Sequence, residues 1–499
     1  MKPFRAVEDN RRSYHRDAAR NSVHRASLLV PELPGSSAWI SFLNHFMLKR
    51  GYEQVGCRIT AIDEAGQRIE SRLVSIDAAR AYAIPLTGMV DAPAHSYLVE
   101  FFAAQNLFIP FPAVMVNHVG DGFLNTVHAY NRVLNDVFED DEINTIQHTE
   151  VAIDLQLADG VDTFVQFAAG ATPVAGDIAI SVSANDRRLT RAVPVALPRF
   201  GQRRIDLAAL FPEIAGCDGG VIRVRAPRQP MFFGRMLVGQ RRADGAFSGN
   251  HSYYDCSDAA EYWDDARPSS RLYPFIAALD NRLRFYPIMA PGRLRLRASA
   301  RDAAGAAVAA LDLGTIASPG DAHLDIDLNA RLRAAGVDPA VVTAVAVDAE
   351  PADGPTPTRI NHQLVYGGGA GSLATSINMS LTNPNVFAPP GKTGFHWGQV
   401  PVGPDLDTWL GLVCNAPDGP DTSIELTLYD EDGVAARRTV ALPAGGATLI
   451  EPDDLRRMAR GEARLNFAWF ELRSDNPDIY GYAVTRHRRS GHMTGEHAF

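Results

Sequence analysis

The sequence predicts an all-β protein of four tandem antiparallel β-sandwich modules, each of about 120 residues and each with short crossover helical turns. Two observations lead to this prediction. A glycine followed six residues later by a histidine recurs at Gly122, Gly245 and Gly491, each time in a segment that reads as a hairpin. Between these segments, short strands with period-two alternation are separated by turn residues roughly every 8–12 residues.

The repeated histidines set the length of the module. They fall at His128, His251 and His497, and Asn378 stands at the corresponding place in the third copy. The spacings of 123, 127 and 119 residues mean that four copies account for nearly all of the 499 residues. We expect a flexible N-terminal tail followed by four modules, of which the first is the most divergent. Their expected ranges are 1–26 for the tail and 27–130, 148–256, 275–380 and 396–499 for the modules.

Inside each module, a strand with alternating polar and apolar residues is followed by a tight turn. The strand is clearest at residues 178–182, 294–297 and 424–428. Three copies continue with Asp-x-x-Gly, at 63–66, 302–305 and 430–433, whereas the second copy has 185–188 and no glycine there. Aspartate can cap its own turn and glycine accepts a positive φ, so this pattern predicts a β-hairpin.

The second half of each module contains a crossover and the closing hairpin. An Asp-Leu pair at 206–207, 327–328 and 454–455 predicts one or two helical turns, because aspartate is a favoured N-cap. Two more strands then lead into the hairpin that carries the repeated histidine. The last of them in the fourth module reads Gly-Tyr-Ala-Val at 481–484.

Together, the strand–Tyr-Asp-x-x-Gly–strand unit, the Asp-Leu turn and the closing Gly-Tyr strand resemble the immunoglobulin-like β-sandwich modules of bacterial multidomain proteins. The resemblance covers all four modules at the level of fold and is strongest in the fourth. It implies four tandem immunoglobulin-like sandwiches that serve as spacers, adhesion units or carbohydrate-binding appendages. It implies no catalytic residue.

Composition narrows the class of protein. The net charge of −10 argues against a nucleic-acid binder, which needs a basic face to neutralise phosphates. No window reaches the ~18 apolar residues of a membrane span. The first 25 residues lack the apolar core of a secretion signal, and four scattered cysteines fit no disulfide framework or zinc motif. A cytoplasmic location is therefore the default expectation, and a surface location reached by another export route stays open.

The histidine column is the candidate metal site. His128, His251 and His497 each have carboxylates or tyrosines nearby, such as Asp121 and Glu496, and histidine with carboxylate suits zinc or iron. In a linear array of sandwiches, equivalent positions lie on the order of 35–45 Å apart. They could share one metal only if the modules closed on themselves. The alternative is that each histidine bonds a neighbouring backbone group and fixes its hairpin.

Partner-binding candidates lie in the same hairpins. Arginines there could donate hydrogen bonds to an acidic protein partner or to a second copy of the chain; they are Arg241, Arg242, Arg488 and Arg489. A polar and aromatic cluster could instead bind a glycan through flat apolar rings, although tyrosines near strand ends also suit a core or a domain interface. That cluster comprises Tyr253, Tyr254 and Trp263.

Other motifs favour no chemistry. The glycines at 367–371 lack the lysine of a phosphate-binding loop and indicate a hairpin tip, and the acidic run 139–142 reads as a solvated linker. His396 and Trp397 are expected in a loop between modules. Ser248 and His251 lie three apart on a strand, and therefore on opposite faces.

The leading interpretation is a non-enzymatic binding or structural scaffold that contacts a protein partner, or itself, through the repeated hairpins. One alternative is a metal-dependent enzyme in which the three histidines converge, and a second is a carbohydrate-binding surface protein.

Overall fold

The computed structural model describes most of the chain. The described residues are 26–103, 109, 112–133, 149–229, 231–234, 236–254, 262–263, 269–288, 292–317, 323–353, 356–357, 360–381, 393–415 and 421–499. The expected N-terminal tail apart from Ala26, the acidic run 139–142 and Cys256 lie outside them.

The described chain is nearly all β and forms four sandwich-like modules, as the sequence predicts. Each module pairs a sheet that holds its first strand, which we call the first sheet, with a sheet that ends in the closing hairpin, which we call the hairpin sheet. In module 1 the first sheet is β1 (Ala26–Pro31), β6 (Ser96–Ala103), β3 (Val55–Ile62) and β4 (Arg68–Ile76), and the hairpin sheet is β5 (Ala81–Pro85), β2 (Ser36–Leu43), β7 (Met115–Gly120) and β8 (Phe123–His128).

Module 2 repeats this order with one additional strand. Its first sheet is β13 (Arg187–Leu197), β12 (Val174–Ala184), β15 (Val221–Arg225), β10 (Thr149–Ala152) and β19 (Tyr253–Tyr254), and its hairpin sheet is β14 (Gln202–Asp206), β11 (Val161–Ala168), β17 (Leu237–Arg242) and β18 (Phe247–His251). A two-stranded ladder of β16 (Met231–Gly234) and β9 (Asn131–Val133) links it to module 1.

Modules 3 and 4 have the same two sheets. Those of module 3 are β21 (Ser269–Pro274), β26 (Ala344–Asp353), β23 (Arg293–Arg301) and β24 (Ala307–Ala317), and then β25 (Leu324–Asp327), β22 (Asp280–Phe285), β28 (Ile360–Gly367) and β29 (Thr375–Leu381). Those of module 4 are β30 (Gly394–Val402), β35 (Asn466–Ser474), β32 (Thr422–Asp430) and β33 (Gly433–Leu442), and then β34 (Ala447–Ile450), β31 (Leu406–Cys414), β36 (Ile479–His487) and β37 (Met493–His497). A small ladder joins β20 (Tyr262–Trp263) to β27 (Thr356–Pro357).

The Asp-x-x-Gly turns are β-hairpins. Gly66, Gly305 and Gly433 have φ values of 73°, 80° and 114°, which only glycine adopts without strain. In the second module, where the glycine is missing, Asn185 and Asp186 take φ values of 49° and 58°. Asparagine and aspartate tolerate this left-handed conformation better than other residues, so the hairpin forms without glycine.

The crossovers are short helices, and the aspartates cap only some of them. They are α4 (Leu207–Leu210), α5 (Leu328–Ala334) and α7 (Pro452–Met458), while α2 (His45–Arg50) lies between β2 and β3. Asp327 accepts a hydrogen bond from the Ala330 amide, as an N-cap does, but Asp206 makes no such bond. Asp454 lies inside α7, whose N-cap is Glu451, so the prediction of an aspartate cap is wrong there. None of the helices in the described ranges has the length and apolar character needed to cross a membrane.

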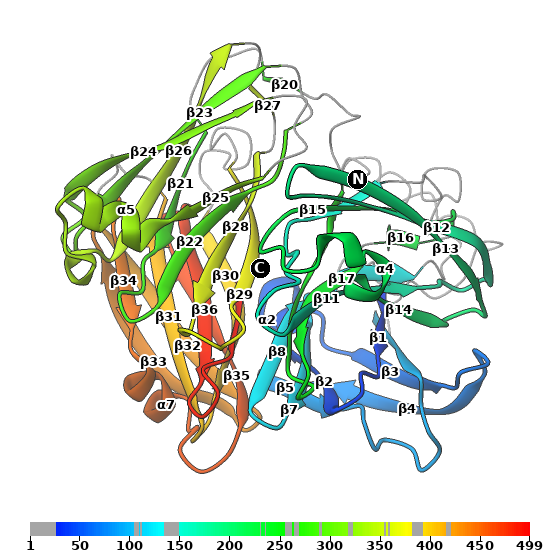
Figure 1. Cartoon of the computed structure of the whole chain (residues 1–499). Coiled ribbons are helices and arrows are strands. Elements are labelled where there is room, and N and C mark those ends of the chain that lie inside the picture. Colours follow the sequence, from blue (N-terminus) through cyan, green and yellow to red (C-terminus); the bar gives the residue numbers. More distant parts are fainter. Residues whose placement is uncertain are drawn as a thin grey trace.

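The four modules form a closed ring (Figure 1). They follow one another around the centre, with module 1 in blue at lower right and module 4 in orange and red at lower left. The first sheet of one module packs on the hairpin sheet of the next. Leu29 and Leu98 of module 1 pack on Phe200 of module 2, and Val151 of module 2 packs on Tyr286 of module 3.

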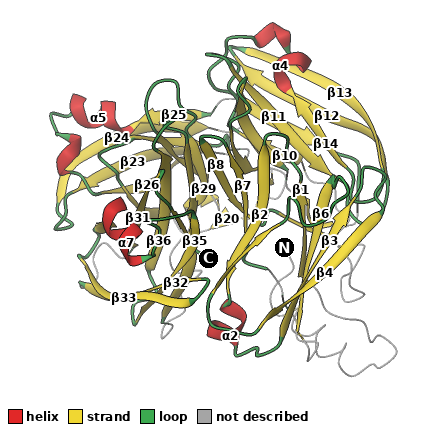
Figure 2. Cartoon of the chain, turned by 90° about the horizontal axis from the view of Figure 1, so that it is seen from below, coloured by secondary structure: helices red, strands yellow, loops and turns green. Residues whose placement is uncertain are grey.

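The same contact closes the ring between modules 4 and 1. The indole Nε1 of Trp469 on β35 donates to the Ser41 hydroxyl on β2 at 2.7 Å, and Trp469 is fully buried. Trp397 on β30 stacks on His45 with 5.0 Å between ring centroids. The expectation that His396 and Trp397 lie in a loop is therefore wrong, because both belong to β30. The view from below shows the same closed arrangement of modules (Figure 2).

Buried neutral histidines are part of this packing. Burial lowers the pKa of His45 and His362 to about 3, and that of His118 and His396 to about 4. In the unfolded chain a histidine titrates near pH ~6.5. Below that pH the unfolded state binds protons that the folded state does not, so the free energy of unfolding falls as the pH falls.

We therefore expect the free energy of unfolding to fall already at pH values well above the pKa of the carboxylates. Each of these histidines should cost roughly 2 kcal/mol of stability by about pH 5. Urea unfolding followed by tryptophan fluorescence at about pH 7.5 and about pH 5 measures the change. The variant His118→Gln should be less sensitive to pH than the wild type, and a urea midpoint that does not move between the two pH values would contradict the assignment.

Candidate functional site

The four closing strands β8, β18, β29 and β37 meet at the centre of the ring. Each is the edge strand of its hairpin sheet, so each carries backbone groups with no partner in its own sheet. Hydrogen bonds to the neighbouring modules satisfy several of them. These are Gly249 N to Asn125 Oδ1 at 2.6 Å, Thr126 N to Thr494 Oγ1 at 2.8 Å, Asn250 Nδ2 to Ser376 O at 2.8 Å, and Met493 N to Leu373 O at 2.9 Å.

Glycines allow the hairpins of modules 3 and 4 to approach so closely. A Cβ atom on Gly368 would lie 2.0 Å from the carbonyl oxygen of Gly491, a distance that no side chain could occupy. Packing against the neighbouring hairpin therefore explains Gly368, and the φ of 106° explains Gly369, in agreement with the prediction of a hairpin tip.

The three repeated histidines converge at the far end of these strands. The ring centroids of His128 and His251 lie 4.6 Å apart, and those of His128 and His497 lie 5.2 Å apart. Asn378 completes the group by donating from Nδ2 to the carbonyl of His251 at 2.5 Å. The linear spacing expected from the sequence is thus wrong: equivalent positions of the four modules share one place. We call these four residues, together with Glu496, the histidine cluster.

Backbone bonds orient two of the rings in the same way. His251 bonds through Nδ1 to the carbonyl of Ser252 at 2.7 Å, and His497 bonds through Nδ1 to the carbonyl of Ala498 at 2.6 Å. A carbonyl only accepts, so Nδ1 carries the proton in both rings. His251 and His497 therefore bond backbone groups at the strand ends, as one interpretation of the sequence expected, and they also converge with His128.

Glu496 is the acidic member of the histidine cluster. Its Oε2 accepts from the backbone N of His128 at 2.9 Å and lies 2.8 Å from the Nδ1 of His128. Burial by itself raises the pKa of Glu496, but the charge of His128 and these hydrogen bonds outweigh it and hold the pKa well below its ordinary value. In the sequence, Glu496 stands among the carboxylates beside the histidine column, but only the three histidines were predicted as candidate ligands.

His128, Glu496 and His497 form the one group of three potential metal ligands found among the described residues. Their ligand atoms all lie within 4.8 Å of one another. His251 borders this group without belonging to it, so the geometry differs from the set of three histidines expected from the sequence.

The arginines of the hairpins make ion pairs within the chain. Arg489 pairs with Asp121 at the tip of the first hairpin. Arg488 lies 2.7 Å from Asp407, and Arg241 lies 3.5 Å from Asp206.

The tips of the four hairpins lie close together. The hydroxyl of Ser490 donates to the carbonyl of Gly122, Gly491 lies against Gly368, and the charges of Arg242 and Asp244 act on His492. We call the surface formed by residues 121–122, 243–245, 368–372 and 488–491 the tip face.

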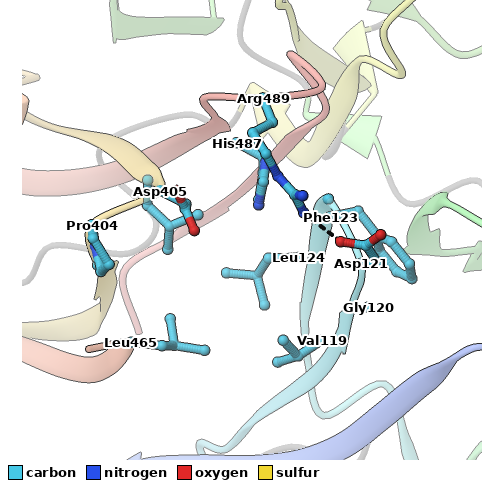
Figure 3. Close-up of a pocket in the computed structure, with 13 residues that line it drawn as sticks. Val119, Gly120, Asp121, Phe123, Leu124, Pro404, Asp405, Leu465, His487 and Arg489 are labelled. Atoms are coloured by element: carbon cyan, nitrogen blue, oxygen red, sulfur yellow. Dashed lines mark hydrogen bonds and ion pairs between the residues drawn. The ribbon is translucent and has the colours of Figure 1, made fainter. Parts of the chain in front are cut away.

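A pocket of about 220 Å³ lies at the tip face between modules 1 and 4 (Figure 3). Its apolar wall consists of Val119, Leu124, Leu406 and Leu465. Figure 3 shows His487 and Arg489 above Val119, Leu124 and Leu465. Asp405 lies on one side, and the ion pair of Arg489 with Asp121 lies on the other. No motif in the sequence indicates this pocket, because it needs both modules.

The aromatic cluster proposed for glycans is only partly described. The ring of Tyr253 packs edge-on against Tyr286 of module 3, with 5.4 Å between centroids, and against His251 at 5.6 Å. The side chains of Tyr254 and Trp263 lie outside the described part of the structure. Tyr253 thus takes part in the interface between modules 2 and 3.

Comparison with known proteins adds little. No protein-family model matches the sequence, and no curated protein matches it. Among solved structures, a chain described as "Biofilm associated protein - BSP domain" is similar over 96% of this chain and 97% of its own, with 8% sequence identity and a TM-score of 0.14. A likeness at that TM-score carries no argument about fold or function.

Asn378 offers a direct test of the cluster's contribution to stability. Besides its bond to His251, its Oδ1 accepts from Tyr286 OH at 3.0 Å and from Gln363 Nε2 at 3.2 Å. Asn378→Ala should lower the free energy of unfolding by about 2–3 kcal/mol, because it leaves buried polar groups with fewer partners. Asn361→Ala is the matched control: that amide accepts from the Ser380 hydroxyl at 2.8 Å in a partly buried position, and we expect a loss below ~1 kcal/mol. If denaturant titrations give the same loss of free energy of unfolding for both variants, Asn378 contributes no more to stability than an ordinary partly buried amide.

Proposed function

We propose that the protein is a non-enzymatic binding and structural scaffold, in which the ring holds the four hairpin tips as one surface that contacts a protein partner. The observation that carries the proposal is the pocket between the first hairpin and module 4, whose lining includes the tip-face residues Asp121, Gly122 and Arg489. The hairpin strands contact one another inside the ring, so only the tips of the hairpins are available to bind a partner.

A ring suits this role because it fixes the relative positions of the tips. Neighbouring modules bury apolar side chains between whole sheets, as Leu29 and Phe200 do, and such faces resist hinge motion. A partner that spans two or more tips therefore meets a preformed surface, which lowers the entropy lost on binding.

The chemistry of the pocket indicates what it would take from a partner. Four aliphatic side chains form one wall, and Arg489, Asp121 and Asp405 form a charged rim. The side chain of Asp121 is 93% exposed, so water screens its pair with Arg489 and the pair is easily exchanged. We expect the partner to insert an aliphatic side chain that has a carboxylate beside it, which would pair with Arg489.

Selection from a phage-displayed peptide library tests this proposal. The wild type should enrich peptides with an aliphatic residue next to Asp or Glu. Leu465→Trp should abolish their binding because the indole fills the pocket, and Arg489→Ala should weaken it about tenfold, the equivalent of one charge-assisted hydrogen bond. Leu73→Trp is the control, since Leu73 is 66% exposed on β4 and lies outside the pocket.

Two outcomes would count against the proposal: no enrichment over an unrelated protein, or peptides that bind Leu465→Trp as well as they bind the wild type. Sedimentation velocity of the purified protein separates a foreign partner from a second copy of the chain. If the partner is a second copy, the wild type should sediment as an oligomer and Arg489→Ala should dissociate more readily; if the partner is foreign, both should sediment as monomers.

A further inference from the structure

We propose that the histidine cluster binds one zinc ion, which joins the first and last modules through His128, Glu496 and His497. Module 1 contributes His128 at the end of β8, and module 4 contributes the other two from β37. The ion would therefore lie where the ring closes. This inference does not depend on the partner surface, because the cluster lies about 20 Å along the strands from the hairpin tips.

The distances between the donor atoms suit a tetrahedral ion. Zinc bonds nitrogen at ~2.0–2.1 Å and carboxylate oxygen at ~2.0–2.2 Å, which places neighbouring ligand atoms roughly 3.3 Å apart. Glu496 Oε2 lies 2.8 Å from His128 Nδ1, and Glu496 Oε1 lies 3.7 Å from His497 Nε2. These two contacts use different carboxylate oxygens, so rotation of the carboxylate has to bring one oxygen to the ion together with the two nitrogens. The three ligand atoms already lie within 4.8 Å of one another, and zinc would replace the proton between His128 and Glu496.

The tautomer of His497 supplies independent support. Its Nδ1–H donates to the carbonyl of Ala498, so in the neutral ring Nε2 carries a lone pair. That lone pair faces the carboxylate oxygen of Glu496 at 3.7 Å. Glu496 Oε1 also accepts from the backbone N of His497 at 3.0 Å, but that bond leaves it a second lone pair. Two acceptors that face each other repel, and a cation between them removes the repulsion. Histidines that bind metals usually donate their other N–H to a carbonyl or carboxylate in this way.

The donor set favours zinc over other common ions. Two imidazoles and one carboxylate suit zinc and iron, whereas calcium and magnesium prefer oxygen ligands throughout. Iron of the two-histidine, one-carboxylate type needs open coordination positions. Here His128 is 8% and Glu496 is 6% exposed, and the ring of His251 packs 4.6 Å from that of His128. The site therefore suits a four-coordinate ion with three protein ligands and one water, which would lie beside His497, whose side chain is 19% exposed.

Zinc titration of the intact chain tests the inference. Protein treated with EDTA and then dialysed should bind one zinc per chain in isothermal titration calorimetry, and its thermal midpoint should rise with the zinc concentration because zinc binds the folded state. Cobalt(II) should give the strong visible absorption of tetrahedral coordination. Iron(II) added without oxygen should bind more weakly than zinc, because divalent ions generally follow that order of affinity.

Variants then locate the ion. Glu496→Gln keeps the size of the side chain and His497→Gln removes one imidazole; each should lower zinc affinity at least tenfold and abolish the cobalt spectrum. His95→Gln is the control, because this partly exposed histidine of module 1 is outside the group, and it should bind zinc as the wild type does.

The inference fails if zinc neither binds stoichiometrically nor raises the thermal midpoint of the wild type, or if Glu496→Gln and His497→Gln bind zinc unchanged. The titration of the wild type decides the matter by itself if a variant does not fold. A negative result here leaves the peptide selection unaffected, because Leu465→Trp acts at the other end of the hairpins.

Discussion

The structure depends on how four unpaired strand edges are satisfied. Each module finishes with a hairpin whose last strand lies at the edge of a sheet, and an exposed edge invites pairing with other chains. In this protein the four edges meet one another. Asn125 accepts from the backbone of module 2, and Thr494 accepts from that of module 1, so side chains satisfy edge groups that a ladder would otherwise pair. The ring is the arrangement that gives every closing strand two neighbours.

Closing the ring requires each first sheet to have two apolar faces. On β1, Leu28 points into the core of its own module, and the next residue, Leu29, packs on module 2. On β10 the same division holds for Ala152 and Val151. A sheet buried on both sides loses the alternation of polar and apolar residues, and its strands read as continuous apolar runs. In the sequence, the ring therefore appears as apolar residues at positions that are polar in an isolated sandwich.

The features that depend only on neighbouring residues, namely the strands, turns and hairpins, could be predicted from the sequence. The Asp-x-x-Gly turns and the spacing of His128, His251 and His497 predicted the all-β modules and their hairpins, because turns and alternation are local. Closure depends on contacts between distant modules, and the apolar run at 467–470 was the available signal, since it leaves no face for water. The pairing of Glu496 with His128 could not be predicted for the same reason, because the two residues lie 368 residues apart in the chain.

A ring made from one chain differs from an assembly of identical subunits in one respect. Four identical subunits must present the same side chain at every equivalent position around the axis. A charged side chain at the centre would therefore occur four times, and the four like charges would repel. Covalent linkage of the repeats permits symmetry breaking. The chain places three imidazoles and one amide, Asn378, at the equivalent positions and adds one buried carboxylate from Glu496. The centre can therefore be a single polar site rather than four copies of one.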